Sequence, residues 1–268
     1  MKKLNHLSEI YKSYDCFIID LWGVMHDGIK LYNEAVNAVD NLTKENKRIV
    51  FLSNAPRPNI NVINFLKKLK LDDKYLKNIL TSGEAALKSL KRNKFGKKFY
   101  HLGPQRDQSL FNNLEKNKVS INECEYILCT GLFDDKINDL NFYSNLLKDH
   151  INKKFICTNP DLIVHRGNTE EYCAGTIAAL FEKMGGKVIY FGKPHLEVYK
   201  MCLKENEKSL IIGDNLRTDI KGANNLNLDS IFITNGVHRS EYKSEKDLIS
   251  LLKKYSVEAK YFQSNLIW

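Results

Sequence analysis

The sequence has no hydrophobic run long enough to cross a membrane. A helix that spans a bilayer needs about 20 consecutive apolar residues, and polar or charged residues interrupt every apolar stretch of this chain well before that length. The first residues, MKKLNHLSEI, also lack the apolar segment that follows the lysines of a secretory signal. These absences predict a cytoplasmic protein with no membrane partner.

Closely spaced cysteine pairs are missing as well. None of the six cysteines belongs to a CxxC pair, and several lie within apolar runs, which is typical of buried, reduced thiols. We therefore expect no disulfide framework, no redox pair and no zinc site. The chain also has no evident internal repeat or low-complexity tract.

Basic residues are in excess, but they are not gathered in one place. The net charge is +9, yet lysines alternate with acids and asparagines, as in KENKR at 44–48 and KENEK at 204–208. This mixture is typical of solvated helix faces. We expect no nucleic-acid partner, although a positive field would favour small anionic substrates.

The stretch CFIIDLWGVMHDG at 16–28 is the feature around which the rest of the chain is organised. An apolar run at 17–19 ends in Asp20 and a turn, which predicts a buried parallel strand that delivers an acid to the carboxyl edge of a sheet. Taken alone, this pattern fits an ordinary strand end equally well. A second predicted strand at 48–52, apolar from residue 49, ends in Ser53, for which a helix cap or a turn is the commoner use.

Two later stretches supply what such an acid would need. Lys193 follows an apolar run at 188–191, and Asp214 follows a predicted strand at 209–212 that is apolar from residue 210, with Asp219 five residues further on. In a doubly wound α/β sheet these strand ends converge on one crevice. Phosphoryl transfer through an aspartyl-phosphate requires a carboxylate nucleophile, a cation held by oxygen ligands, and donors for the phosphoryl oxygens.

The predicted roles follow from those requirements. Asp20 fits the nucleophile, and Asp214 is placed to bind Mg²⁺ together with it. Ser53 and Lys193 would hold the phosphate.

The alternation of strands and helices divides the chain into three segments. A charged crossing with a glycine at 91–98 leads into a second α/β unit, which ends in a helix at 173–184 followed by two glycines. We therefore predict a core at 1–93, an inserted domain at 94–187 and the rest of the core at 188–268. The strand at 188–191 is assigned to the core.

Four segments carry a family resemblance: FIIDLWGVMHDG, FLSNAPR, GKPH and IIGDNLRTDIKGANN. They resemble the motifs of the haloacid dehalogenase (HAD) superfamily, and the lobe inserted between the second and third makes the chain similar to its class IIA, NagD-like and p-nitrophenyl phosphatase-like, hydrolases. The resemblance implies a HAD-like doubly wound parallel core with an inserted α/β cap of the C2 type. It also implies Mg²⁺-dependent hydrolysis of a small phosphorylated metabolite, such as a sugar phosphate or a nucleotide, through an aspartyl-phosphate.

Carried over residue by residue, the resemblance assigns a role to each motif. It makes Asp20 the nucleophile and a metal ligand, Ser53 and Lys193 the phosphate-binding pair, and Asp214 a Mg²⁺ ligand. Asn54 would orient the nucleophile or the phosphate, and Asp219 would support the metal site.

The predicted cap contains the segment TNPD at 158–161, which matches a recurrent stretch of that class facing the active site. Candidates for contact with the leaving group are Asn159, Asp161, His165 and Arg166. The alternative is an ordinary loop with satisfied turn residues. Arg166 would suit a substrate with a second anionic group, and a helix starting near residue 169 would form the back wall.

One position departs from the family pattern. HAD phosphatases usually have a second aspartate two residues after the nucleophile, and this chain has Trp22. A tryptophan keeps the backbone carbonyl that this position contributes to Mg²⁺, but it cannot transfer a proton. His26 or Asp27 could replace the acid, although a turn role suits both better. The alternative function is therefore a weakly catalytic protein that binds a phosphorylated ligand. The C-terminal residues 262–268 are either a last packed element or a contact in a homodimer.

Overall fold

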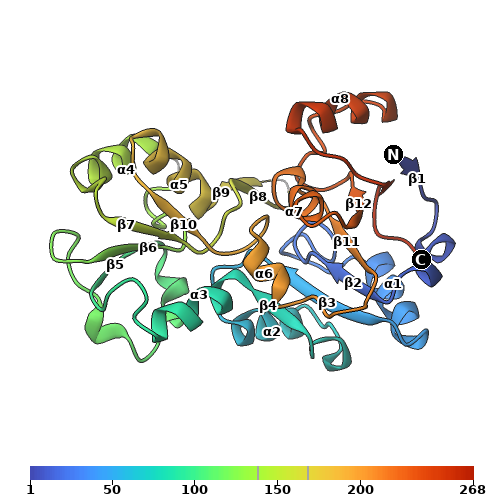
Figure 1. Ribbon diagram of the computed structural model, residues 1–268, viewed down its shortest axis with the longest axis horizontal. Helices are drawn as coiled ribbons and strands as arrows, with labels where there is room; N and C mark the ends of the chain where they lie inside the picture. Colours follow the sequence, from blue (N-terminus) through green and yellow to red (C-terminus); the bar gives the residue numbers. More distant parts are fainter. Residues whose placement is uncertain (138, 168) are drawn as a thin grey trace.

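Two parallel β-sheets, one in each of two lobes, form the framework of the protein (Figure 1). The computed structural model describes residues 1–137, 139–167 and 169–268. The lobes lie side by side along the long axis, and both chain termini are in the lobe on the right of Figure 1. The predicted α/β class and doubly wound parallel core are confirmed.

The larger sheet has seven parallel strands in the order β1-β13-β12-β11-β2-β3-β4. Its central strands are apolar and almost wholly buried, as expected for a sheet covered on both faces. Their bounds are β1 Lys2–Lys3, β2 Cys16–Ile19, β3 Arg48–Ser53, β4 Ile79–Thr81, β11 Ser209–Gly213, β12 Asp229–Ile233 and β13 Tyr261–Gln263.

Helices cover this sheet on both faces. One face packs against α1 (Asn33–Lys44) and α2 (Asn59–Lys68). The other packs against α6, α7 and α8, whose bounds are Leu196–Lys200, Lys221–Asn225 and Glu245–Tyr255. The C-terminal residues belong to this packing, because β13 pairs with β12 and Leu266 is buried.

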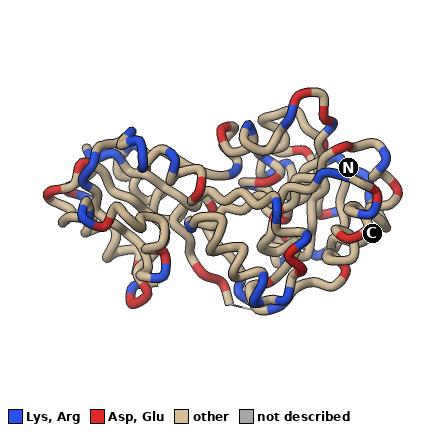
Figure 2. Tube along the Cα trace, turned by 90° about the horizontal axis from the view of Figure 1, so that it is seen from below, with Lys and Arg blue, Asp and Glu red and all other residues tan. Residues whose placement is uncertain are grey.

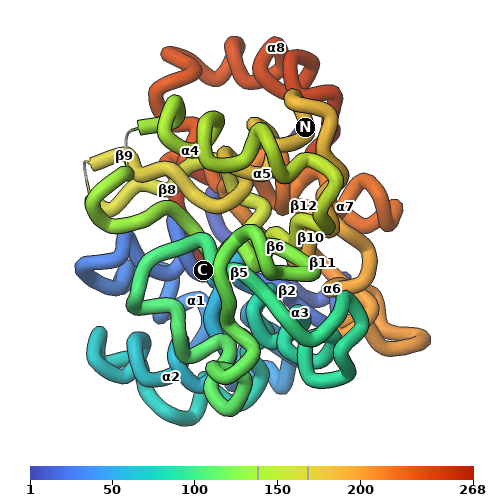
Figure 3. Tube along the Cα trace, turned by 90° about the vertical axis from the view of Figure 1, so that its left-hand side faces the viewer, coloured from blue at the N-terminus to red at the C-terminus, as the bar shows by residue number. Residues whose placement is uncertain are grey.

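The smaller sheet has four parallel strands in the order β10-β7-β6-β5. It lies between α4 and α5 on one face and α3 on the other (Figure 3). The bounds are β5 Phe99–Leu102, β6 Tyr126–Cys129, β7 Lys154–Cys157, β10 Val188–Tyr190, α3 Ser82–Lys91, α4 Leu140–Leu147 and α5 Ala174–Lys183.

The strand β10 corrects the sequence prediction. The sequence places the run at 188–191 in the core, but Val188–Tyr190 pairs with β7 in the smaller sheet. The predicted boundary at 187 therefore falls just before the last strand of that sheet. The apolar pattern at 188–191 predicts a strand but not the sheet to which the strand belongs. Only its pairing with β7 shows that it joins the smaller sheet.

A hairpin of β8 (Ile163–Arg166) and β9 (Thr169–Tyr172) lies between the lobes (Figure 1). The prediction of a helix starting near residue 169 is wrong, because the next helix, α5, begins at Ala174. The segment at 169–172, TEEY, has no apolar spacing that distinguishes a strand from a helix start. Pairing with β8 makes it a strand.

Helix α3 belongs to the cores of both lobes. Leu87 and Leu90 pack with the aromatic cluster beneath the smaller sheet, while Ala85 packs against the cluster of the larger sheet. The crossing at 91–98 therefore starts at the end of a helix that packs against both lobes.

The surface carries both signs of charge on each lobe, with lysine and arginine interspersed with aspartate and glutamate (Figure 2). All six cysteines are buried, as predicted. Among the described residues, no helix combines the length and hydrophobicity that a membrane span requires.

Candidate active site

The predicted strand-end residues come together at the carboxyl edge of the larger sheet. Asp20 follows β2, Ser53 ends β3, and Asp214 follows β11. Because β2 pairs with both β3 and β11 in parallel register, these three ends lie next to one another. Each strand is a run of buried apolar residues that stops where the polar residue begins, which is why the sequence pattern located them.

Lys193 occupies the centre of this group. Its Nζ lies 2.6 Å from Oδ1 of Asp20 and 2.7 Å from Oδ1 of Asp219, and its side chain is 2% exposed. Burial acts to lower the pKa of Lys193, and the charges of Asp20 and Asp219 outweigh it, so the pKa is raised well above its usual value. The lysine is therefore a fixed positive charge beside Asp20.

Asp214 is held against backbone that only glycine allows. Its Oδ2 accepts a hydrogen bond from the Val237 amide at 2.7 Å. A Cβ added to Gly23 would lie 2.1 Å from this oxygen, and one added to Gly236 would lie 2.0 Å from it. Gly23 also has a φ of +82°, so the turn after β2 needs glycine for both space and conformation.

Three buried carboxylates, those of Asp20, Asp214 and Asp219, each offer an oxygen within 4.8 Å of the others. Burial raises the pKa of Asp20 to about 8, with Asp219 adding to the rise and Lys193 opposing it. Burial and the charges of Asp20 and Asp219 raise the pKa of Asp214 well above its usual value. The cluster thus contains more carboxyl groups than the single charge of Lys193 can keep ionised.

A carboxylate from the smaller lobe joins two asparagines of the larger one. Oδ1 of Asp161 accepts hydrogen bonds from Nδ2 of Asn54 at 3.1 Å and from Nδ2 of Asn215 at 3.2 Å. Asn54 in turn accepts a hydrogen bond from the Lys193 amide at 2.8 Å. Burial raises the pKa of Asp161 to about 6, against the opposing charge of Lys193. Asp161 therefore links the lobes directly behind the cluster.

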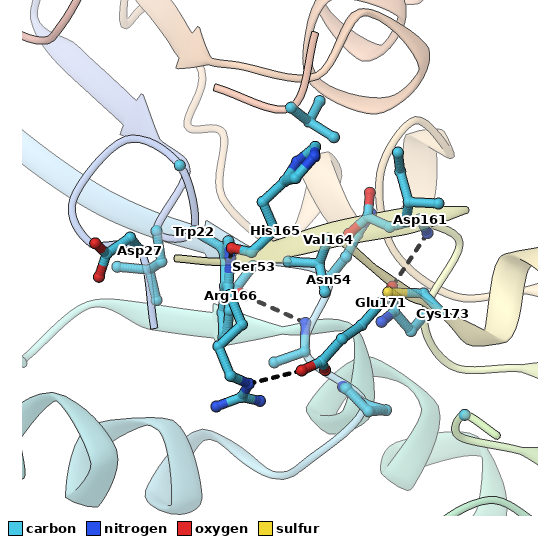
Figure 4. Close-up of a pocket in the computed structure, with 18 of the residues that line it drawn as sticks. Trp22, Asp27, Ser53, Asn54, Asp161, Val164, His165, Arg166, Glu171 and Cys173 are labelled. Atoms are coloured by element: carbon cyan, nitrogen blue, oxygen red, sulfur yellow. Dashed lines mark hydrogen bonds and ion pairs between the residues drawn. The ribbon is translucent and has the colours of Figure 1, made fainter. Parts of the chain in front are cut away.

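The other predicted residues of the smaller lobe line the same cavity, whose volume is about 470 Å³. The side chain of Asn159 accepts a hydrogen bond from the Asp161 amide. His165 and Arg166 point to opposite sides of β8, and Arg166 bonds Glu171 of β9 at 2.9 Å (Figure 4). Asp20, Ser53, Asn54 and Asp214 line the same space.

Trp22 contacts the hairpin. Its Nε1 donates to the backbone oxygen of His165 at 2.7 Å, and the guanidinium of Arg166 lies 5.4 Å from the centroid of its ring. A Cβ at Gly28 would lie 2.5 Å from the indole, so this glycine makes room for the ring. The side chain at this position therefore spans the two lobes.

Sequence reasoning missed several residues of the site. Asn215 stands directly after Asp214, and its position in GDN was a usable signal. Arg239 and Tyr32 also line the cavity, but both lie outside strands and no spacing points to them. The amide of Val237 cannot be identified from side-chain chemistry at all.

Two family models match the chain. One, described as haloacid dehalogenase-like hydrolase, matches residues 17–116, and the other, described as HAD-hydrolase-like, matches residues 190–252. Together they cover more than half of the sequence, and the segment between them contains most of the smaller lobe.

Individual relatives agree with these matches. The chain is 34% identical to the ribonucleotide monophosphatase NagD of Escherichia coli over 88 residues, which cover 31% of this chain and about a third (34%) of that protein. It is 25% identical to an acid sugar phosphatase of Staphylococcus epidermidis, over 88% of this chain and 93% of that protein. A solved haloacid dehalogenase-like hydrolase from Brucella suis superimposes with a TM-score of 0.87 at 27% identity, covering 98% of this chain and all (100%) of that one.

Proposed function

The chain belongs to the haloacid dehalogenase-like hydrolases, in their NagD-like class IIA, and on that premise we propose that it is a Mg²⁺-dependent phosphatase. Its substrate would be a small phosphorylated metabolite, hydrolysed through an aspartyl-phosphate at Asp20. The observation that carries the proposal is the buried cluster of Asp20, Lys193, Asp214 and Asp219. The named activities of two relatives, a ribonucleotide monophosphatase and an acid sugar phosphatase, support phosphoric monoesters as the substrate class.

The donor set suits Mg²⁺. The ion prefers hard oxygen ligands, and the three clustered carboxylates offer such oxygens within 4.8 Å of one another. Asp20 and Asp214 would hold the ion together with the backbone carbonyl of Trp22, and Asp219 would support the site. When bound, Mg²⁺ would neutralise charge on the carboxylates and the phosphoryl group, which favours the ionised forms of acids that burial otherwise protonates.

The residues of the chain would then divide the reaction between them. Lys193, with Ser53 and Asn54, would bind the phosphoryl oxygens and keep the phosphorus in line with Asp20. A carboxylate oxygen of Asp20 would attack phosphorus while the bond to the leaving oxygen breaks, and that oxygen would leave as an anion or take up a proton from water. Water then attacks the phosphorus of the aspartyl-phosphate, releasing inorganic phosphate and the free carboxylate.

The smaller lobe, including β10, would act as a cap over this cavity. Asn159, Asp161, His165 and Arg166 would face the leaving group, as their positions on the cavity wall support. Asp161 would also hold the phosphate-binding Asn54 in place.

One observation favours a second candidate function. Trp22 replaces the usual acid and its side chain is engaged with His165 and Arg166. A protein that binds a phosphorylated ligand and turns it over poorly would have this arrangement.

The assay that separates the two candidates follows p-nitrophenyl phosphate with and without Mg²⁺. We expect Mg²⁺-dependent release of p-nitrophenol by the wild type and a loss of at least about a thousandfold in Asp20→Asn, because the variant has no nucleophile. Asp15→Asn is the matched control, since Asp15 is an exposed carboxylate that directly precedes β2, whereas Asp20 directly follows it. No release by the wild type, or equal release by Asp20→Asn, would contradict the proposal.

A further inference from the structure

The arginines on the wall of the cavity differ in what they bind. Four of them line it, and three are already neutralised by carboxylates. The three pairs are Arg57 with Asp107, Arg106 with Asp134, and Arg166 with Glu171. The fourth, Arg239, makes no ion pair within the described residues. Its Nη2 donates to the backbone oxygen of Gly167 at 3.2 Å, which leaves most of the five N–H donors of the guanidinium unused.

Arg239 is close to the reacting centre along the chain. It comes two residues after Val237, whose amide binds Asp214. It is exposed, whereas the cluster around Asp20 is buried. Arg239 therefore belongs to the solvent-exposed part of the cavity lining.

A second group with spare hydrogen-bonding capacity faces the same region. Nδ1 of His165 is buried and has no hydrogen-bond partner in the part of the chain that the structure describes. His165 and Arg239 line the same cavity, and Arg239 is bonded to Gly167, two residues from His165 along the chain. The other ring nitrogen of His165, Nε2, lies 3.7 Å from Oε2 of Glu170. His165 points to the side of β8 opposite Arg166, which bonds Glu171 (Figure 4).

We propose that Arg239 and His165 form a second anion-binding subsite, which selects phosphate monoesters whose leaving group carries a carboxylate or a second phosphate. This inference rests on the proposed function, and it names the substrate class for the same cavity. One anionic group of a ligand could pair with the guanidinium of Arg239 and accept a hydrogen bond from Nδ1 of His165. Arg166, which the sequence favoured for this role, is neutralised by Glu171 and packed on Trp22.

The direct test measures binding of phosphonates, which retain the phosphate shape and are not hydrolysed. Titration calorimetry in the presence of Mg²⁺ would compare ω-carboxyalkylphosphonates with two to four carbons, the α,ω-alkylene bisphosphonates and the uncharged alkylphosphonates of equal length. For the wild type we expect at least one charged series to bind about tenfold or more tightly than its uncharged counterparts, the gain of one charge-assisted hydrogen-bonded contact. The preferred series identifies the second group as carboxylate or phosphate.

Substitutions assign the preference to a residue. Arg239→Gln should abolish the preference for the charged ligands while leaving affinity for the uncharged alkylphosphonates within about twofold. Arg239→Lys should retain part of it. Arg92→Gln is the matched control, because Arg92 is exposed at the end of α3 and does not line the cavity. A merely structural contact of Arg239 with Gly167 would instead weaken all the ligands equally.

The outcomes for the subsite and for catalysis are separate. The inference is overturned if the wild type shows no preference for charged phosphonates, if it binds none of them, or if Arg239→Gln keeps the preference. Hydrolysis of p-nitrophenyl phosphate, followed in parallel, reports on the proposed function. If the wild type prefers the charged phosphonates but does not hydrolyse p-nitrophenyl phosphate, the subsite is supported and the phosphatase proposal is refuted. If it hydrolyses p-nitrophenyl phosphate but shows no charge preference, the phosphatase proposal is supported and the subsite is refuted.

Discussion

Trp22 uses the position next to the nucleophile for packing rather than for proton transfer. Its indole N–H binds the backbone of His165, and its ring lies beneath Arg166. General acid catalysis contributes typically about 10²–10⁴-fold, and neither contact supplies it. The consequence depends on the substrate, because an aryl leaving group departs without a proton more readily than an alkyl one.

Trp22→Asp should therefore raise kcat for an alkyl phosphate such as glycerol 2-phosphate by about tenfold or more, and less for p-nitrophenyl phosphate. The measurement is the ratio of the two kcat values in wild type and variant. Trp22→Asn is the control, since it removes the same packing without adding an acid. Equal effects of the two substitutions on that ratio would contradict the account.

The residues around Asp20 also mark the limit of what the sequence predicts. The sequence pattern locates Asp20, Ser53 and Asp214 because each follows a buried apolar run, and these parallel strands end at one edge of the larger sheet. Lys193 follows β10, a partly exposed strand of the smaller sheet, so the strand-end argument does not place it and only the resemblance of GKPH to the family motif does. Arg239 follows no such run. It lies in a loop between β12 and α8, and the path of that loop brings it to the cavity. The sequence pattern carries no information about that path.

The hairpin of β8 and β9 lines the cavity and contacts the larger lobe. Besides the bond from Trp22, the amide of Gly167 donates to the backbone oxygen of Asp27 at 3.1 Å. Arg239 donates to the backbone oxygen of the same Gly167. These bonds come from partners more than 70 residues away in sequence, so the local sequence could not indicate the strand that replaces the helix expected near residue 169.

Trp22→Phe should loosen this hairpin without unfolding the protein. The variant keeps an aromatic ring under Arg166 but loses a hydrogen bond of about 1 kcal/mol, which corresponds to roughly fivefold faster opening. Hydrogen exchange followed by mass spectrometry should show faster exchange for amides of β8 and β9. The buried strands β5 and β6 serve as the internal reference, and unchanged exchange in the hairpin would refute the role of the indole N–H.

At the scale of the whole molecule, both lobes bury neutral histidines. Burial lowers the pKa of His26 in the larger lobe to about 4 and that of His101 in the smaller lobe to about 4, from an ordinary value of 6.5. Between those values the unfolded chain binds protons that the folded chain does not. Their contribution to stability is fully present above pH 6.5 and is lost as the pH falls toward 4.

The buried histidines should therefore lower the melting temperature as the pH falls from 7 to 5, whereas the raised pKa values of Asp20 and Asp214 act in the opposite direction. Each buried histidine adds a slope that approaches about 1.4 kcal/mol per pH unit within its window. His101→Gln should remove the slope that His101 adds, so that its melting temperature falls less, or rises more, than that of the wild type over this range, because glutamine can still bond the hydroxyl of Thr130 but does not titrate. His150→Gln, at a partly exposed site, is the control, and an unchanged slope in His101→Gln would show that His101 is not responsible.

The central claim is that Asp20 forms a covalent bond to the phosphoryl group. Its most direct test is acid quenching of the wild type during turnover of p-nitrophenyl phosphate with Mg²⁺, followed by mass spectrometry of the peptide from 16 to 28. The account predicts one added phosphoryl group on Asp20, which disappears when Mg²⁺ is chelated before substrate is added and is missing in Asp20→Asn. Turnover with no label on Asp20, or with the label on another residue, would contradict it.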